Sequence, residues 1–328
     1  MRNIDESAKK IVFVVDKGKL VATVTDGDIR RYLLLGHSLQ DPVMNCANCT
    51  PHTATSRSQA KEIMERFQLN CVPVIRHDGQ IRELVFRDLT TVEPPKLAGP
   101  VVVLGGGKGH RREPFTNVLP KPLVPVGDRP ILEHIMKQFS LYGCNSFHLI
   151  VNHKKQLIKA FFAECESDYD VHFYDETAPL GTGGGLYMLR NVIDQTFFLT
   201  NCDILIDADY EDICRFHKKS GNAVTMVCAY KNIQIPYGVI EMGMNGTIEA
   251  MREKPELSFL TNTGMYLVEP CVLEDIPENT PISFPNIVEL QLKKGRSVSV
   301  YPINESEWMD MGQMEEYQKM CQRLETQK

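Results

Sequence analysis

The sequence predicts an α/β protein whose mostly parallel or mixed sheet carries helices on both faces, preceded by a small α+β region. Apolar strand-like runs alternate with helical patterns over residues 101–198. The segment TTVEPPKLAGP at residues 90–100 is rich in proline, which discourages helix and sheet and indicates a linker. Before it, a strand–turn–strand–helix pattern occurs twice. We therefore expect paired small modules at residues 1–93, a linker at 94–100 and a main domain at 101–328.

Length and charge limit the possible classes of function. A chain of 328 residues suits two domains, and a net charge of −6 gives no general attraction to nucleic acid or anionic membranes. No apolar run is long enough to span a bilayer, and the N-terminal MRNIDESAKK lacks the apolar core of a signal peptide. We expect a cytoplasmic protein that binds neither nucleic acid nor membrane, so an anionic ligand needs a local site.

The ten cysteines are scattered along the chain. Cys46 and Cys49 form one C-x-x-C, but no second pair follows at a spacing that would complete a zinc site. We expect ordinary thiols in a reducing compartment.

The two N-terminal repeats are expected at residues 11–29 and 71–89, the second preceded by an amphipathic helix around residues 58–68. The stretch TVTDGDIRR resembles the end of a CBS module, so the pair resembles tandem CBS modules. This resemblance implies a regulatory adenine or guanine nucleotide, with Thr25 and Asp28 holding its ribose. The first module is truncated at its N-terminus, and Val85 replaces the hydroxyl residue in the second, although Asp88 remains. A dimerisation or scaffolding appendage, and hence a homo-oligomer, is the alternative.

The stretch VVVLGGGKGHRREPFTNVLPKPLVP at residues 101–125 places glycines and cations directly after an apolar strand. The backbone amides after Leu104, at residues 105–107, can form an anion cradle. Arg111 and Lys121 add charges that suit a triphosphate. The spacing fits neither a Walker loop nor a dinucleotide fingerprint, and the prolines at 114, 120 and 122 predict that no helix forms here.

At this point the segment resembles the opening motif of sugar-phosphate nucleotidyltransferases, G-G-x-G-T-R-x-x-P-x-T-x-x-x-P-K-P, with His110 in place of the threonine. The resemblance implies a Rossmann-like, GT-A-like fold. It also implies that Leu104, Gly105, Gly106 and Gly107 bind the nucleotide. By the same resemblance Arg111 holds the departing pyrophosphate, and Lys121 contacts the phosphate under attack.

The stretch ETAPLGTGGGL at residues 176–186 resembles the turn with which that family reads the nucleobase. It nominates Glu176, Gly181 and Thr182 as nucleotide-binding residues, and its glycines are expected to let a ligand approach the backbone closely. A carboxylate only accepts hydrogen bonds, and guanine offers paired donors. We therefore favour GTP; a surface glutamate without base contact is the alternative.

Two aspartates are the candidate metal ligands. FFLTNCDILID at residues 197–207 resembles the family's N-G-D motif with Cys202 in place of glycine, and EWMDMGQMEEY at 307–317 resembles W-x-D-I-G-T-P-E-D-Y. The resemblance implies that Asp203 and Asp310 bind Mg²⁺, with Asp203 also catalytic.

Three further segments, PYGVIEM, REKPE and TNTGMYLVEP, resemble the acceptor site. This resemblance implies that Gly238, Glu253 and Asn262 face the sugar and that Lys254 faces its phosphate.

The resemblance covers roughly residues 99 to 320, and implies transfer of a nucleotidyl group from an NTP to a sugar 1-phosphate, with release of pyrophosphate. Together with the CBS pair, the chain resembles the glucosamine-1-phosphate guanylyltransferases of legionaminic acid biosynthesis. The alternatives are a mannose- or heptose-1-phosphate guanylyltransferase and a cytidylyl- or uridylyltransferase. An alternative of another class is a nucleotide-sensing regulator with an inactive transferase domain, supported by His110 and Cys202 at motif positions.

Overall fold

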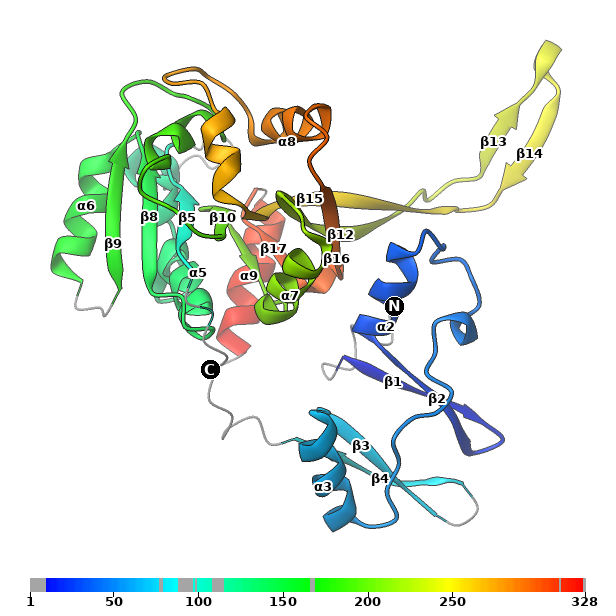
Figure 1. Ribbon diagram of the computed structural model, residues 1–328. Helices are drawn as coiled ribbons and strands as arrows, with labels where there is room; N and C mark the ends of the chain where they lie inside the picture. Colours follow the sequence, from blue (N-terminus) through cyan, green and yellow to red (C-terminus); the bar gives the residue numbers. More distant parts are fainter. Residues whose placement is uncertain are drawn as a thin grey trace. The chain divides into compact units, whose positions relative to one another are not determined.

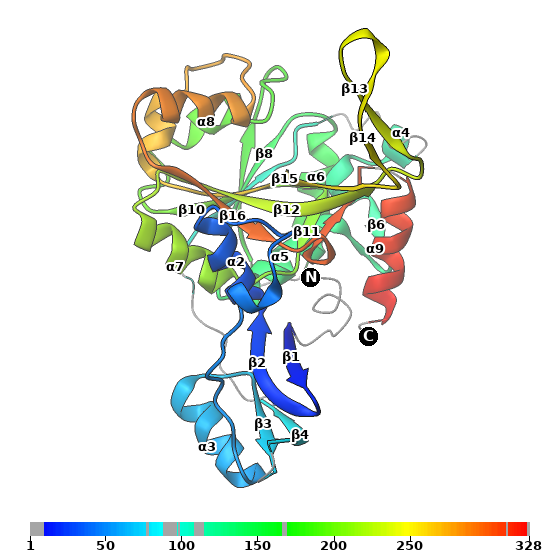
Figure 2. The ribbon, with the colours of Figure 1, turned by 90° about the vertical axis from the view of Figure 1, so that its right-hand side faces the viewer.

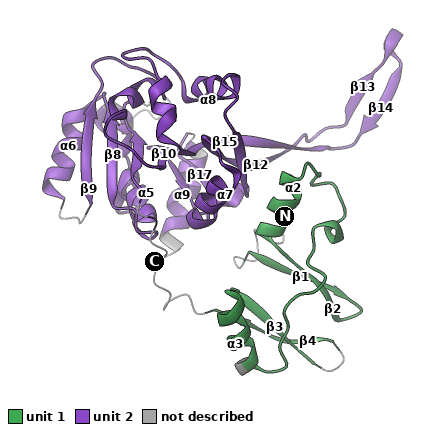
Figure 3. Ribbon diagram, viewed as in Figure 1, with its two compact units in different colours: residues 1–93 green, residues 94–328 purple. Residues whose placement is uncertain are grey.

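The chain divides into two compact units, residues 1–93 and 94–328, each described by itself (Figure 3). The computed structural model describes residues 10–76, 79–87, 97, 99–107, 115–165, 169–312 and 314–326. Within these ranges, no helix has the length and apolarity needed to cross a lipid bilayer. All ten cysteines are free thiols.

The first unit contains two antiparallel strand pairs, each with one helix. Strands β1 (Ile11–Asp16) and β2 (Lys19–Thr25) lead into helix α2 (Asp26–Leu34), and α3 (Arg57–Phe67) leads into β3 (Cys71–Ile75) and β4 (Ile81–Phe86). These elements lie where the sequence predicts them. The helix expected after β4 begins at Asp88, outside the described residues. The buried apolar clusters of this unit are small: Ala54, Ala60, Met64, Val72, Val74 and Val85 in one, and Val24 and Ile29 in the other.

The second unit is built on a seven-stranded sheet (Figures 1 and 2). Its strands, in spatial order, are β16 (Val298–Ile303), β12 (Val224–Gln234), β15 (Glu256–Val268), β10 (Phe197–Asn201), β5 (Val101–Leu104), β8 (Ser146–Val151) and β9 (Asp170–Asp175). Only β15 runs antiparallel to its neighbours; the other pairs are parallel. The prediction of a mostly parallel sheet with mixed strands is confirmed.

Helices cover both faces of this sheet, as predicted, because the side chains of each strand alternate between two cores. Val101 and Val103 join one core and Val102 the other. The first core lies under α5 (Ile131–Ser140), α6 (Lys155–Glu164), α7 (Tyr210–Ser220) and α9 (Met314–Thr326). The second lies under α8 (Phe284–Lys293) and the 3₁₀ helices η5 (Gly184–Leu189) and η7 (Pro270–Asp275).

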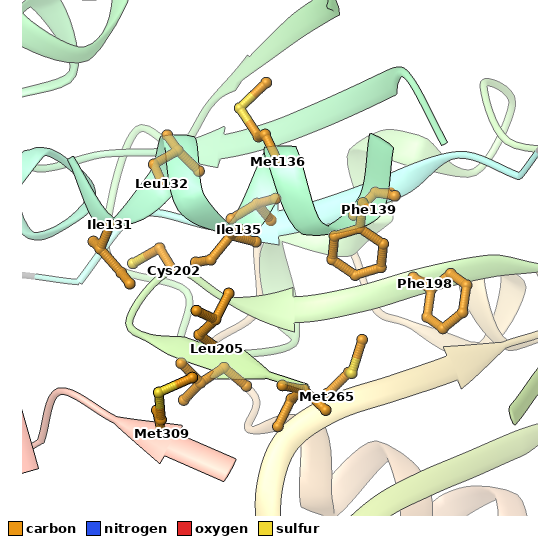
Figure 4. Packing of buried hydrophobic residues seen from close by; sticks show 14 of the residues in the cluster. Ile131, Leu132, Ile135, Met136, Phe139, Phe198, Cys202, Leu205, Met265 and Met309 are labelled. Atoms are coloured by element: carbon orange, nitrogen blue, oxygen red, sulfur yellow. The ribbon is translucent and has the colours of Figure 1, made fainter. Parts of the chain in front are cut away.

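Figure 4 shows how the first core is filled. Ile131, Ile135 and Phe139 recur every four residues along α5, so they form one apolar stripe that faces Phe198 and Cys202. Each such side chain, when fully buried, stabilises the fold by roughly 1.5–3 kcal/mol.

Short elements surround the sheet. They are α4 (Phe115–Val118), the 3₁₀ helices η1 (Val43–Asn45), η4 (Lys121–Leu123), η6 (Met244–Gly246) and η8 (Glu305–Glu307), and three small strand pairs. The pairs are β6 (Pro125–Val126) with β7 (Arg129–Pro130), β11 (Ile204–Ile206) with β17 (Trp308–Asp310), and β13 (Val239–Met242) with β14 (Ile248–Arg252).

Strands β13 and β14 form a hairpin that projects beyond the outer ends of β12 and β15 (Figure 1). We call residues 233–260 the hairpin arm. Ile240 is paired with Met251 and Met242 with Ile248 across the hairpin, with a register shift between the two pairs, so these four side chains share one face, and each is more than half exposed. On the other face Arg252 pairs with Glu241 at 2.9 Å.

Candidate active site

A cavity of about 780 Å³ lies at the carboxyl ends of β5, β8, β9 and β10, the position where open α/β sheets bind ligands. Many residues predicted from the sequence line it: Leu104, Gly106, Gly107, Lys121, Glu176, Gly181, Thr182, Asp203, Asn262 and Asp310. Gly105 does not line the cavity; its N–H donates to the Ile150 carbonyl at 2.8 Å and so anchors the loop to β8.

Lys121, Asp203 and Asp310 come together in the cavity wall. The Lys121 Nζ lies 2.5 Å from Asp203 Oδ2. Asp203 follows β10 and precedes β11, whose Ile204 is paired with Asp310 of β17. The Met311 N–H donates to the Asp203 carbonyl at 2.9 Å and fixes this pairing. Two aspartates far apart in sequence are thereby held next to each other beside one lysine.

Lys121 is a cation held among acidic neighbours. Burial alone would lower the pKa of its ammonium group, but the carboxylates of Asp203 and Asp310 act in the opposite direction, and the net pKa is raised. Lys121 therefore stays protonated at neutral pH and can neutralise an anion that enters the cavity.

The two aspartates fit a magnesium site that is completed by substrate. In the described part of the chain, no group of three or more His, Cys, Asp or Glu side chains could hold a metal ion. Mg²⁺, however, is commonly held by one or two carboxylates together with substrate phosphates and water. Asp203 and Asp310 supply that number of carboxylates.

Cys202, which replaces the glycine of the metal motif, is accommodated by the core. Its side chain packs among the apolar residues under α5 (Figure 4). Burial raises the pKa of this thiol to about 12, so it is neutral. The substitution thus leaves Asp203 and Lys121 in contact.

Another part of the cavity wall is formed by the residues that follow three adjacent parallel strands. Gly106 follows β5, Asn152 follows β8 and Glu176 follows β9. The Glu176 N–H donates to the Val151 carbonyl at 2.9 Å. The Glu176 residue is only 6% exposed. Burial raises the pKa of its carboxyl group, while the Asn152 side chain and the Leu180 N–H lower it.

The glycine turn at residues 181–185 packs against the segment before α8. A Cβ placed on Gly184 would lie 2.4 Å from the Thr280 carbonyl oxygen. Thr182 Oγ1 accepts a hydrogen bond from the Phe284 N–H at 2.9 Å. The sequence interpretation, that this glycine run admits a ligand, is wrong at Gly184, where another segment of the chain occupies the space.

Three predicted acceptor-site residues lie elsewhere. Gly238, Glu253 and Lys254 are neighbours at the base of the β13–β14 hairpin: a Cβ on Gly238 would lie 3.1 Å from Glu253 Oε2, and the Lys254 N–H donates to the Tyr237 carbonyl at 3.2 Å. None of the three is among the residues that line the cavity. Asn262, by contrast, lines it and donates from Nδ2 to the Tyr266 hydroxyl at 2.7 Å.

The motif after β5 is only partly described. Arg111 and His110 lie outside the described residues, so their predicted roles stay predictions. The expectation that no helix forms between the prolines is wrong. Residues after Pro114 form the single turn α4, and Pro122 lies inside the 3₁₀ turn η4, which carries Lys121 into the cavity. Proline is compatible with the first turn of a helix, and these helices have only one.

In the first unit, Thr25 and Asp28 form a reciprocal cap at the start of α2. The Thr25 hydroxyl accepts from the Asp28 N–H at 3.2 Å, and Asp28 Oδ2 accepts from the Thr25 N–H at 2.8 Å. Asp28 Oδ1 also pairs with Arg31 at 2.5 Å. A capping box accounts for both side chains, and their regulatory role stays a prediction.

The structure adds lining residues that the sequence analysis missed: Asn152, Asn201, Thr263, Tyr266, Phe284 and Trp308. Asn152 and Asn201 could have been found, because each stands at the end of a predicted parallel strand. Trp308 shares a strand face with Asp310, two residues on. Its indole nitrogen is buried and has no hydrogen-bond partner within the described residues.

Comparison with known proteins agrees with this geometry. A profile of the nucleotidyl transferase family matches residues 100–327. A mannose-1-phosphate guanyltransferase of Emericella nidulans is 31% identical over 226 residues, which cover 66% of this chain and 61% of that protein. The enzyme of Candida albicans is 32% identical over 231 residues, with 66% and 62% covered. The chain thus spans about three fifths of the length of these relatives.

Solved structures share the fold. HddC from Yersinia pseudotuberculosis superposes with a TM-score of 0.55 at 23% identity, covering 69% of this chain and 99% of that one. A UDP-glucose pyrophosphorylase complexed with UDP-glucose gives 0.54 at 17% identity, covering 71% and 100%. Because the matched family segment takes in most of the chain and every residue that lines the cavity, the chain belongs to the nucleotidyl transferase family.

Proposed function

We propose that the protein transfers a nucleotidyl group, GMP in preference, from an NTP to a sugar 1-phosphate and releases pyrophosphate. The observation that carries the proposal is the convergence of Lys121, Asp203 and Asp310 in the wall of one cavity. The base preference is supported by the names of the relatives, which are mannose-1-phosphate guanyltransferases, and by the acceptor-only chemistry of Glu176.

The reaction needs no nucleophile from the protein, because the attacking oxygen belongs to the phosphate of the sugar. That oxygen forms a bond to the α-phosphorus of the NTP, and the bond from this phosphorus to the bridging oxygen breaks, so pyrophosphate leaves. The protein has to align the two substrates and neutralise charge. Lys121, a protonated ammonium group in the cavity wall, would contact the α-phosphate. Asp203 and Asp310 would hold Mg²⁺, which when bound would supply further charge neutralisation on the phosphates.

The sugar is proposed only as a class. The relatives' names favour mannose 1-phosphate, whereas the resemblance of the N-terminal region favours glucosamine 1-phosphate. The first assay should test both sugar phosphates as acceptors, with GTP, CTP and UTP as donors, and should measure the release of pyrophosphate. Absence of release with every combination would favour the regulator alternative.

Replacing Lys121 tests the site directly. In Lys121→Ala the α-phosphate loses its protein cation, so we expect kcat to fall by at least about a hundredfold. The variant's fold is checked by its melting temperature, because Asp203 loses its partner. Lys319→Ala is the matched control: Lys319 pairs with Glu316 at 3.0 Å on the exposed surface of α9, and its loss leaves turnover unchanged. Full turnover in a folded Lys121→Ala protein would contradict the proposal.

A further inference from the structure

The hairpin of β13 and β14 has no support from the rest of the second unit. Within the described residues its two strands pair only with each other, and none of their side chains belongs to a buried apolar cluster. A two-stranded hairpin alone in water is marginally stable at best, and it becomes stable when a third strand or another apolar surface packs against it. The hairpin therefore needs a covering surface that these elements do not supply.

The hairpin arm also concentrates exposed apolar side chains. Of the sixteen large apolar side chains that are exposed in the described part of residues 94–328, ten lie on the arm. At its centre Ile240, 53% exposed, faces Met251, 66% exposed, across the hairpin. The other six belong to or follow six different helices. Contiguous exposed apolar surface of this kind marks an interaction site, whereas single exposed apolar side chains are ordinary.

The sheet that carries the arm cannot cover it. Strands β12 and β15 stay paired as far out as Gln234 with Glu256. Along β15, Glu256 is six residues from Asn262 in the cavity wall, which is roughly 20 Å at about 3.3 Å per residue. Strands β13 and β14 lie beyond this point (Figure 1). Folding the hairpin back onto the sheet would therefore break the outer pairs of β12 with β15.

The chemistry of the exposed face defines what can cover it. The four side chains of the face that includes Ile240 and Met251 are all uncharged, while Arg252 and Glu241 pair with each other on the opposite face. A nucleic acid or an anionic membrane would find no complementary charge here. An apolar surface of the same size does match. In the described part of residues 94–328, the arm is itself the surface with that concentration of apolar side chains.

We propose that the arm is a dimerisation surface, against which the arm of a second copy of this chain packs. Because the same residues meet on both sides, the contact closes as a dimer. A large apolar side chain carries roughly 100 Å² of apolar surface, so ten that are on average slightly more than half exposed present on the order of 600 Å² per arm. Two arms then bury about 1,200 Å², the lower end of the range for stable interfaces.

Sedimentation velocity of the full-length protein tests the proposal through two substitutions at one position. The wild type is expected to be a dimer or a multiple of dimers. In Met251→Glu two like charges enter the apolar contact, so the dissociation constant should rise at least about a hundredfold and the mass of the assembly should halve. Met251→Leu keeps an apolar side chain of similar size and should keep the wild-type mass.

Two further variants are controls for the position of the change. Glu241→Gln removes the exposed pair with Arg252 from the opposite face of the hairpin, and Leu157→Glu places a charge on an exposed apolar side chain of α6. Both should keep the wild-type mass. Circular dichroism of every variant checks that its secondary structure is that of the wild type.

Three results would overturn the proposal. The first is a wild type that is monomeric at micromolar concentration. The second is an assembly with the same mass in Met251→Glu as in the wild type, because a surface other than a second arm would then cover the hairpin. The third is dissociation of Leu157→Glu to the same extent as Met251→Glu, because the effect would then not belong to the arm.

Discussion

His148 is a titratable residue that the sheet holds in its neutral form. It lies on β8 with 7% of its surface exposed. Its Nδ1 atom is 2.9 Å from the Tyr174 hydroxyl, and its ring stacks on His172 at 5.1 Å. Burial and the neighbouring His172 lower the pKa of His148, Asp170 opposes both, and the net pKa is about 4. Folding therefore excludes a proton that the unfolded chain would bind in mild acid.

This exclusion makes stability depend on pH. The contribution of His148 is fully present above its ordinary pKa of 6.5 and is lost as pH falls from 6.5 to about 4. It amounts to at most about 3 kcal/mol. In His148→Gln the free energy of unfolding, measured by urea denaturation, should fall less steeply between pH 6.5 and 4 than in the wild type. His172→Gln, at a half-exposed neighbour, is the control and should keep most of the slope. An unchanged slope in His148→Gln would contradict the assignment.

The site role of a residue could be predicted where neighbouring residues in the sequence mark it, and could not where it depends on the tertiary structure. Asp203 could be predicted because it ends an apolar strand, and Lys121 because it stands in a long spaced motif. Trp308 could not, since its buried N–H group becomes visible only when burial and partners are known. Thr25 and Asp28 illustrate the reverse problem, because the same spacing serves a helix cap and a ribose contact equally well.

At the scale of elements, the two glycine segments beside the cavity differ in how closely other atoms approach their Cα atoms. Gly184 has the Thr280 carbonyl oxygen at 2.4 Å and the Leu180 Cβ at 2.8 Å from an added Cβ, whereas no atom of the residues that the structure describes lies within 4 Å of one added to Gly107. The first segment is packed against protein, and the second is open to the cavity.

Alanine at these two positions should therefore have opposite effects. Gly184→Ala forces backbone to move and should lower the free energy of unfolding by about 1–3 kcal/mol. Gly107→Ala should leave stability unchanged and weaken nucleotide binding instead, because its methyl group enters the cavity. Denaturant unfolding and nucleotide titration of both variants check the contrast. Equal stability of the two variants would contradict this prediction, because it would show that the backbone around Gly184 can move to make room for a methyl group.

The strands of the main sheet could be predicted because buried parallel strands are continuous apolar runs bounded by turns. The place of YGVIEM could not. This segment forms strand β13, but β13 pairs with β14 alone and leaves the sheet. The residue types of a strand carry no information about which other strand will lie alongside it.

At the scale of the whole molecule, the two units differ in the size of their buried apolar cores. The cavity and both large apolar cores lie in residues 94–328. The buried clusters of residues 1–93 are far smaller, and a small core gives low stability.

We therefore expect residues 94–328, expressed alone, to fold and to retain the nucleotide affinity of the full chain. Scanning calorimetry of the full chain should show a transition at lower temperature that is missing from the fragment. The fragment's Kd for GTP, compared with that of the full chain, is the second measurement. A fragment that is unfolded, or folded but unable to bind nucleotide, would contradict this expectation. It would show that residues 94–328 need residues 1–93 in order to fold or to bind nucleotide.

The inner end of the hairpin arm and the cavity wall share two strands, β12 and β15. Their pairing runs from Val224 with Val268 to Gln234 with Glu256 at the arm, and Asn262 lies along the way. Residues 235–238 and 253–255 then separate this ribbon from β13 and β14. Backbone hydrogen bonds between β12 and β15 therefore connect Asn262 in the cavity wall to the place where the arm begins.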